Sequence, residues 1–307
     1  MSGYRKDRPL VLLSGGVGGA RLARGLVPLC PRLTTVVNTG DDDQIYGLHV
    51  SPDIDTVLYT LAGIAGPQGW GISNDGFTIM GHLENLGLDT RFQIGDRDFA
   101  TNLYRTYRLN EGAPLSVVTS ELAKRLGVAA PILPVTDDLV PTRIKVEGEW
   151  ISFQEYFVHR NHRDPVDQVE FAGAATSLPA PGVLAALEEA EAVLIAPSNP
   201  PLSIWPILAI PGIRQAVAKK ERVFCVSPLI GGKALKGPAD RVMQALGLGS
   251  GNQSVINAYE GLISDLIVHT DDVEEQLTGV TSVHATDTLI AQPAAAGRFS
   301  EWLLGLF

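Results

Sequence analysis

The sequence predicts an α/β fold: a three-layer, Rossmann-like parallel sheet with a smaller inserted α+β subdomain. The first observation is the order at the start of the chain, where an apolar run, a glycine-rich turn, a helix and a β-branched run follow one another. Such alternation is typical of parallel strands joined by helices that cover both faces of a sheet. The second observation is that short apolar runs return beyond residue 190. The expected strands lie within 10–14, 34–38, 192–200, 222–232, 264–272 and 281–289.

The first elements are justified by composition and by turn residues. Residues 10–14 (LVLLS) are apolar enough for a buried strand, and 15–19 (GGVGG) are expected to form a turn. A helix is expected over 20–29. Residues 34–38 (TTVVN) are β-branched, which favours a second strand that ends in an acidic loop.

The segment 51–61 (SPDIDTVLYTL) predicts a helix that begins with two carboxylates. We expect Ser51 to cap the free N–H groups of the first turn, and Pro52 suits a position that needs no N–H partner. The apolar residues recur at helical spacing and define one buried face. Asp53 is expected to interact with the helix dipole. Asp55 falls about 100° around from the buried stripe, so its presence needs another explanation.

The middle of the chain predicts the inserted subdomain. Residues 116–133 have helical spacing, and 142–158 alternate apolar and polar residues around Glu147-Gly148, which indicates a hairpin. We therefore divide the chain into a Rossmann-like core, 1–115 and 173–307, and an inserted subdomain, 116–172, that contains the hairpin.

Length and composition exclude several classes of protein. The 307 residues carry 34 acidic and 24 basic side chains, and a net charge of −10 argues against a nucleic-acid-binding face. Cys30 and Cys225 are too far apart for a metal-binding spacing and are expected to be buried thiols. No apolar run reaches the roughly 18 residues of a membrane span, and the start of the chain lacks a signal-peptide core. A cytoplasmic location is expected.

Ligands of open α/β sheets bind at the carboxyl ends of the strands. The first such end carries Gly15, Gly16, Gly18 and Gly19, whose N–H groups can approach an anion. The segment lacks the Lys-Ser/Thr of a P-loop, and Arg21 stands at the third glycine position of a dinucleotide fingerprint. The alternative interpretation of this segment is a plain strand-to-helix turn. A second alternative, that the protein is a dehydrogenase, is supported only by this segment and by one acid.

That acid belongs to the run Asp41-Asp42-Asp43, directly after the second strand. A solvated loop is the simplest interpretation of three adjacent acids. However, Asp41 at a strand end and Asp55 at a helix start are both expected to face the crevice. Two carboxylates together with phosphate oxygens and water are the usual ligands of Mg²⁺.

Two further segments carry polar groups suited to a substrate. Asp96, Arg97 and Asp98 follow a glycine, either as an ordinary helix-start ion pair or as an arginine presented to an anion. Ser198 and Asn199 follow a buried strand and precede two prolines, which indicates a rigid polar loop.

Nothing in the sequence predicts covalent catalysis. His159 and His162 are three residues apart, with no third metal ligand near them in sequence. There is no Ser-His-Asp arrangement and no context for a nucleophilic cysteine.

Together these segments resemble the 2-phospho-L-lactate transferases, a family that makes the phosphodiester of a coenzyme F-420 precursor. The resemblance covers residues 14 to about 240. The matching segments are SGGVGGAR (14–21), VVNTGDD (36–42), SPDIDTVLYTL (51–61), WGISNDGF (70–77), GDRDFAT (95–101), FQEYF (153–157), APSNPPLSIWPIL (196–208) and VSPLIGG (226–232).

The resemblance implies a Mg²⁺-dependent phosphotransferase of EC class 2.7.8 that acts as a homodimer, without nucleic-acid or membrane partners. The family transfers 2-phospho-L-lactate, phosphoenolpyruvate or 3-phosphoglycerate from a guanosine diphosphate ester to the ribityl hydroxyl of the deazaflavin Fo and releases GMP. No covalent intermediate is expected.

The resemblance also implies roles for particular residues. Asp55 binds Mg²⁺ or orients the attacking hydroxyl, with Asp41 as the second metal ligand. Arg97 contacts an anionic oxygen, and its neighbour Asp96 belongs with it to the catalytic residues. The residues that bind the substrates are Gly15, Gly16, Gly18, Gly19, Asn38, Asp55, Gln93, Ser198, Asn199 and Pro200.

An alternative from the same superfamily is a regulatory protein that binds nucleotide-sugars and has no transferase activity. The GDRD segment and the FQEYF segment favour the transferase. Two residues depart from the pattern of the transferases: Asn102 stands where histidine is common, and Gly76 stands where threonine is common.

Overall fold

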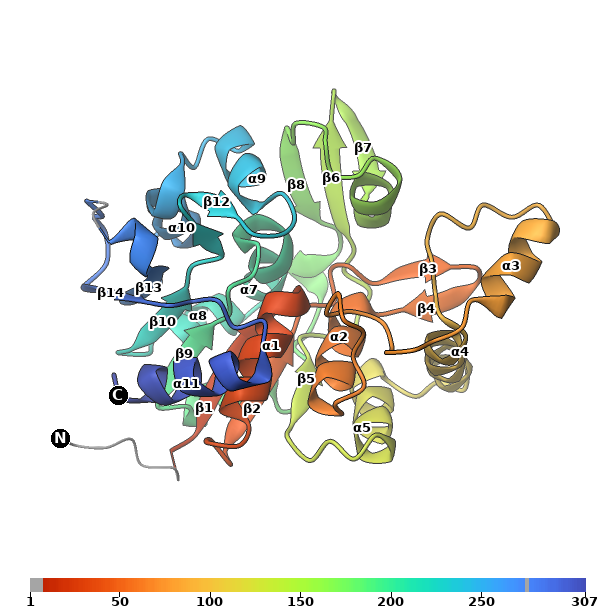
Figure 1. The fold of residues 1–307 in the computed structure, drawn as a ribbon, viewed down its shortest axis with the longest axis horizontal. Helices are drawn as coiled ribbons and strands as arrows, with labels where there is room; N and C mark the ends of the chain where they lie inside the picture. Colours follow the sequence, from red (N-terminus) through yellow and green to blue (C-terminus); the bar gives the residue numbers. More distant parts are fainter. Residues whose placement is uncertain (1–7, 274–275) are drawn as a thin grey trace.

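The computed structural model describes residues 8–273 and 276–307 (Figure 1). The predicted α/β class is confirmed: in these residues seven strands form one sheet, and all neighbouring strands are parallel. From edge to edge the strands are β14 (Ser282–Thr286), β13 (Asp265–His269), β10 (Val223–Val226), β9 (Ala192–Ile195), β1 (Leu10–Ser14), β2 (Leu33–Val37) and β5 (Ile132–Pro134).

Helices cover both faces of this sheet, as predicted. Leu10 and Leu12 of β1 pack into one apolar layer, and Val11 and Leu13 pack into the other, because successive residues of a strand point to opposite faces. The first layer is formed with α1 (Gly16–Leu26), α2 (Pro52–Leu61), α5 (Leu115–Arg125) and α11 (Pro293–Leu304). The second is formed with α6 (Val183–Glu189), α7 (Trp205–Ala209), α8 (Ile213–Ala218) and α10 (Gly251–Tyr259).

A side lobe extends from the sheet beyond α2, at the right of Figure 1. The small apolar core of this lobe contains Leu48, Val50, Met80 and Ile94. The lobe consists of β3 (Asp43–Ile45), β4 (Leu48–Val50), α3 (Thr78–Asn85) and α4 (Asp96–Asn110). The remaining short elements are η2 (Ala174–Thr176), η3 (Pro200–Ile204), β11 (Leu229–Ile230), β12 (Lys233–Ala234), α9 (Ala239–Ala245) and η4 (Thr270–Asp272).

The predicted hairpin is confirmed in a small antiparallel sheet of β6 (Thr142–Val146), β7 (Glu149–Ser152) and β8 (Gln168–Phe171). Glu147 and Gly148 have φ values of 50° and 85°, the left-handed pair that a tight hairpin turn requires. The expected strand character of 153–158 is wrong. Because Ser152 pairs with Arg143 near the start of β6, no partner remains, and the chain turns into the π-helix η1 (Glu155–His159).

The range 116–172 is divided between two sheets. Strand β5 pairs with β2 in the central sheet, and α5 packs against α2 and β5. Strands β6, β7 and β8 instead pack with η1 on Leu202 and Val242. The division of the chain into domains at 116 and 172 stays a prediction. Among the described residues, no helix has the length and apolar character that a bilayer crossing demands.

Candidate functional site

The crevice of the central sheet opens between β1 and β9, because the chain runs from β1 to one side and reaches β9 on the other. Ligands of open α/β sheets bind at such a switch point. Ser198, after β9, donates its hydroxyl hydrogen to the carbonyl oxygen of Gly15, after β1, at 2.6 Å. The two strand ends that the sequence assigned to the substrate are therefore joined directly.

The glycine segment is helical rather than a turn, since α1 begins at Gly16, and the predicted turn over 15–19 is wrong. Packing explains its composition. A Cβ on Gly18 would lie 2.1 Å from the carbonyl oxygen of Pro197, and one on Gly19 would lie 2.1 Å from Oγ of Ser14. Gly15 would meet Ser203 at 2.5 Å. The glycines let α1 lie close against the strand ends, and their role toward a phosphate stays a prediction.

Asp53 lies at the start of α1, although it belongs to α2. Its carboxylate accepts the N–H of Gly16 at 2.7 Å and the amide N–H of Asn38 at 3.0 Å. Asn38 also donates to Asp41 at 2.6 Å. The expectation that Asp53 serves the dipole of its own helix therefore misses its main contacts, which tie α1, α2 and the loop after β2 together.

Asp42 connects the loop after β2 to residues before α2. One carboxylate oxygen accepts the Ser51 hydroxyl at 2.7 Å and lies 3.0 Å from Nε2 of His49. The other oxygen, Oδ1, is buried without a hydrogen-bond partner among the described residues. The Ser51 side chain accepts no N–H of α2, so the predicted cap is wrong, and its hydroxyl hydrogen bonds to Asp42 instead.

Asp55 is buried, with 5 % of its surface exposed, so the expectation that it lies outside the buried stripe is wrong. It forms an ion pair with Arg105 of α4, which is fully buried. Arg105 also donates to Oδ1 of Asn102 at 2.6 Å. The sequence analysis missed Arg105, although Asp98, Asn102 and Arg105 share one face of the helix by their spacing.

The acids of the crevice interact electrostatically. Burial, followed by the charge of Asp53, raises the pKa of Asp41 well above its usual range. Burial raises the pKa of Asp53 to about 6, although hydrogen bonds from Asn38 and Gly16 oppose this shift. The pKa of Asp55 is also raised by burial, despite the opposing charge of Arg105. These carboxylates are therefore short of positive charge.

The acids of the crevice offer part of the ligand shell of a magnesium ion. No three His, Cys, Asp or Glu side chains in the described ranges converge as a metal site. Mg²⁺ commonly binds through one or two carboxylates and completes its shell with water and substrate phosphates. The unpartnered Oδ1 of Asp42 and the raised pKa of Asp41 fit such a partial site.

A cavity of about 310 Å³ lies between the acidic loop and the β6–β7 hairpin. Its lining includes Asp42 and Asp43 on one side and Trp150 and Phe153 on the other. Oγ1 of Thr142, also in the lining, is buried without a partner among the described residues. The cavity is thus lined both by aromatic side chains and by two residues, Asp42 and Thr142, that each carry a buried oxygen atom without a partner among the described residues.

The residues predicted from the GDRD segment lie in the side lobe. Asp96 accepts the N–H groups of Thr78 and Ile79 at 3.1 and 2.8 Å, so it caps the start of α3. Arg97 is exposed and donates to the Ser73 carbonyl oxygen, and its backbone N–H lies 2.9 Å from the Asp75 carboxylate. Gln93 is exposed in the loop before α4.

The loop after β9 is held by local contacts, and its predicted rigidity stays a prediction. Asn199 accepts the N–H of Leu202 at 3.3 Å, and Pro200 is buried as the first residue of η3. Packing also explains the glycine at position 76, where the family commonly has threonine. A Cβ there would lie 2.4 Å from the Asp96 carboxylate.

Comparison with known proteins gives one consistent result over nearly the whole chain. The family described as 2-phospho-L-lactate transferase CofD matches residues 10–291. A 2-phospho-L-lactate transferase of Methanopyrus kandleri is 40 % identical, over 96 % of both chains. A phosphoenolpyruvate transferase of Streptomyces coelicolor is 42 % identical, over 91 % of this chain and 90 % of that protein.

The fold is shared with a crystal structure of a UPF0052 family protein from Bacillus halodurans. The TM-score is 0.66 at 17 % identity, and the match covers 97 % of this chain and 99 % of the other. At this identity the similarity concerns the fold alone.

Proposed function

The chain belongs to the 2-phospho-L-lactate transferase family, and we propose that it transfers a phospho-acid to the deazaflavin Fo in the biosynthesis of coenzyme F-420. The donor is a guanosine diphosphate ester of 2-phospho-L-lactate, phosphoenolpyruvate or 3-phosphoglycerate. The terminal ribityl hydroxyl of Fo attacks the phosphorus that bears the acid. A new P–O bond forms, the bond to the second phosphate breaks, GMP leaves and the hydroxyl proton is lost.

The observation that carries this proposal is the acid cluster at the switch point. Asp41, Asp53 and Asp55 come from a strand end and a helix start, are buried together, and have raised pKa values. Buried carboxylates are costly unless positive charge compensates them. A phosphoryl-transfer site, which gathers cations around a diphosphate, meets that requirement.

Asp55 orients the attacking hydroxyl. Its ion pair with Arg105 fixes the carboxylate, and Asn102 in turn fixes Arg105. A side chain held in this way loses little freedom when the substrate arrives, which is the advantage of a preorganised site.

Magnesium would bind at the acids of this crevice. Asp41 and Asp55 are the predicted ligands, and Asp42 adds a carboxylate oxygen that has no partner among the described residues. The ion supplies charge stabilisation to the diphosphate. Arg97, exposed at the start of α4, contacts an anionic oxygen of the donor, while Asp96 fixes the adjoining helix α3.

The cavity beside the acidic loop is suited to the deazaflavin. Trp150 and Phe153 supply flat apolar walls, and Asp42 lies at the opposite side. The loop of Ser198, Asn199 and Pro200 meets the nucleotide or the deazaflavin, and the glycine segment takes phosphate or ribityl groups.

We further propose that the protein acts in the cytoplasm as a homodimer. Large apolar side chains of the side lobe are exposed, among them Leu86, Leu103 and Tyr107. A second copy that covers them would remove apolar surface from water. Light scattering in solution tests this point.

The test of function is the mass of the product formed when Fo is offered with each guanylylated acid in turn. We expect a phosphodiester of Fo and one equivalent of GMP, and the preferred acid identifies the donor. Tight nucleotide-sugar binding without any product would instead favour the regulatory alternative.

Removal of the metal gives the first prediction. EDTA should abolish GMP release, and added Mg²⁺ should restore it, because the crevice has acids but few bases to neutralise a diphosphate. Full activity in metal-free buffer would remove the ion from the mechanism.

A further inference from the structure

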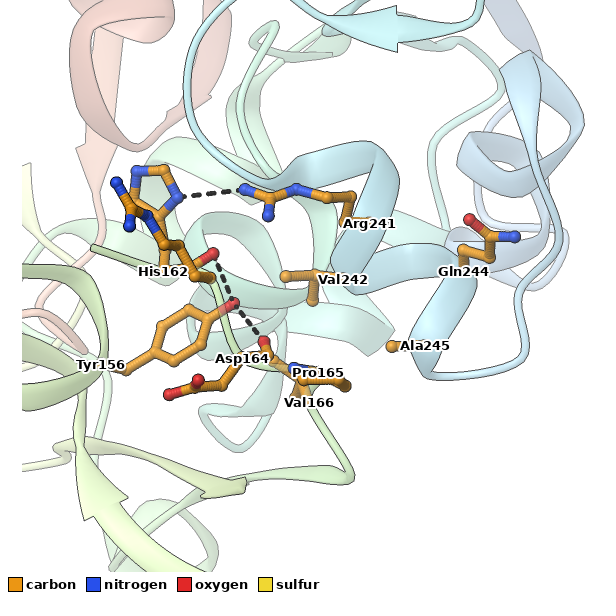
Figure 2. Close-up of a pocket in the computed structure, with 10 residues that line it drawn as sticks. Tyr156, His162, Asp164, Pro165, Val166, Arg241, Val242, Gln244 and Ala245 are labelled. Carbon is orange, nitrogen blue, oxygen red and sulfur yellow. Dashed lines mark hydrogen bonds between the residues drawn. The ribbon is translucent and has the colours of Figure 1, made fainter. Parts of the chain in front are cut away.

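A second cavity, of about 240 Å³, lies between α9 and the loop that follows η1 (Figure 2). None of the residues assigned above to the crevice lines it. Its lining is Tyr156, His162, Arg163, Asp164, Pro165, Val166, Arg241, Val242, Gln244 and Ala245.

Two of the lining residues are arginines whose charge is not compensated. Most arginines of the described ranges have a carboxylate within 4.0 Å, as Arg105 has Asp55 and Arg160 has Asp164. Arg163 and Arg241 have no such partner among those residues, and both line this cavity. Asp164, the one acid in the lining, pairs with Arg160 at 3.4 Å. In a protein with a net charge of −10, two uncompensated guanidinium groups at one cavity call for an anion.

His162 adds a third donor. Arg241 donates to its Nδ1 at 3.2 Å, which leaves the ring proton of the neutral imidazole on Nε2 (Figure 2). Burial, with the charges of Arg241 and Arg163, lowers the pKa of His162 and favours this neutral form.

The loop that carries His162 is held in place. Asn161 and His162 both have left-handed backbone, with φ values of 51° and 43°, a conformation that costs energy unless the surroundings impose it. The Tyr156 hydroxyl contacts the carbonyl oxygens of His162 and Asp164 at 3.5 and 3.4 Å. The backbone of the loop that carries His162 is thus held in place before any ligand binds.

The size and the walls of the cavity limit the ligand. Buried Val166 and Val242 form an apolar part, whereas both arginines are exposed. A volume of about 240 Å³ lies below the range of about 300–1,000 Å³ typical of drug-sized ligands, which favours a small ligand. Planar guanidinium groups match the geometry of phosphate oxygens.

We propose that this cavity is a second binding site, for inorganic phosphate or a small phosphate ester, formed by Arg163, His162 and Arg241. This site is separate from the cavity beside the acidic loop, because the two cavities have no lining residue in common. A row of rings joins the two: Phe153 stacks on Phe157 at 5.3 Å, and Phe157 contacts His162 at 4.8 Å.

The test is a titration of the whole protein with inorganic phosphate, at an ionic strength kept constant with sodium chloride. Histidine ring signals are followed by NMR, and His162→Gln assigns the signal of His162. We expect that signal to shift saturably at millimolar phosphate, while the signal of His284 at the sheet edge stays unchanged. Equimolar acetate should produce a much smaller shift, and an equal shift would overturn the assignment to phosphate.

Matched variants decide whether the arginines form the site. Arg163→Gln and Arg241→Gln should each weaken phosphate binding by about tenfold or more, because each removes a charge-assisted contact. Arg298→Gln is the control, since Arg298 is exposed on α11 and its loss changes the net charge equally. All three arginines are exposed, so folding should persist, and thermal melting verifies it. No shift of the His162 signal in the unmodified protein, or equal binding by all three variants, would overturn the proposal.

Discussion

Helices α2 and α4 begin alike in sequence and differ in what their first turns do. Each carries two aspartates two residues apart, Asp53 and Asp55 in α2 and Asp96 and Asp98 in α4. In neither helix does the residue before the first turn form a side-chain cap. Both acids of α2 are buried in the crevice, whereas Asp96 lies at the surface of the side lobe and caps another helix.

The electrostatic consequences are opposite for Asp53 and Asp96. Backbone N–H groups of α3, from Ile79 first, lower the pKa of Asp96. Burial raises the pKa of Asp53 to about 6. The same local signature therefore gives a stable ionised cap in one place and an undercompensated carboxylate in the other.

Helices α2 and α4 also contact each other through one aspartate from each. Asp55 of α2 pairs with Arg105 of α4, and Asp98 of α4 accepts the hydroxyl hydrogen of Tyr59 of α2 at 2.8 Å. These contacts join the side lobe to the crevice. Burial, rather than the presence of two acids in a first turn, thus distinguishes the starts of the two helices.

Asp55→Asn should give the largest effect. The rate of GMP release should fall by about two to three orders of magnitude, as for the loss of a group that acts where transition-state charge develops. The free energy of unfolding should also fall by about 3–5 kcal/mol, because Arg105 would keep a buried, unpaired charge. Urea unfolding and the rate at saturating Fo measure the two effects.

The double variant Asp55→Asn with Arg105→Met separates these effects. It removes the unpaired charge, so stability should recover while activity stays low. A wild-type rate from Asp55→Asn alone would show that the buried acid of α2 has no catalytic role.

Asp98→Asn should change how stability depends on pH. Burial, with the charge of Asp55, raises the pKa of Asp98 to about 7. Since this value lies above that of the unfolded chain, the contribution of Asp98 is full below the unfolded pKa and is lost as the pH rises through about 7. An amide cannot ionise, so the variant should lose less stability between pH 5 and pH 8, by about 1–4 kcal/mol.

Denaturant unfolding at a series of pH values measures this difference. Identical pH profiles for the variant and the wild type would mean that Asp98 titrates as an ordinary exposed acid.

Asp96→Ala should have the smallest effect. Loss of the cap on α3 should lower the melting temperature only slightly, and Asp96→Asn, which still caps, should recover most of this loss. The rate should change much less than in Asp55→Asn. If Asp96→Asn melts like the wild type but has lost its activity, the carboxylate acts on the substrate and is more than a cap.

Part of this structure follows from local sequence alone. The alternation of apolar runs and helices predicted the parallel sheet, and Glu147-Gly148 predicted the hairpin turn. These features depend on residues close together in the chain, whose periodicity and backbone preferences are encoded where they act.

For the acids of the crevice, the sequence predicted their places in the chain better than it predicted their contacts. The sequence located acids at the ends of β2 and at the start of α2, because the carboxyl edge of a parallel sheet is a property of the fold class. Helical spacing placed Asp55 outside the buried stripe, because spacing identifies only one buried face of a helix. It cannot show that α4 packs on another face of α2 and buries Asp55 there.

The tertiary structure alone decided the partners. Arg105 lies 50 residues beyond Asp55, and Asn38 joins Asp41 to Asp53 only because α2 packs beside the end of β2. The burial that raises the pKa values of these acids comes from the same packing. Spacing along the chain determines which residues share a face of one element, whereas the approach of two elements determines which charges meet and how much water they keep.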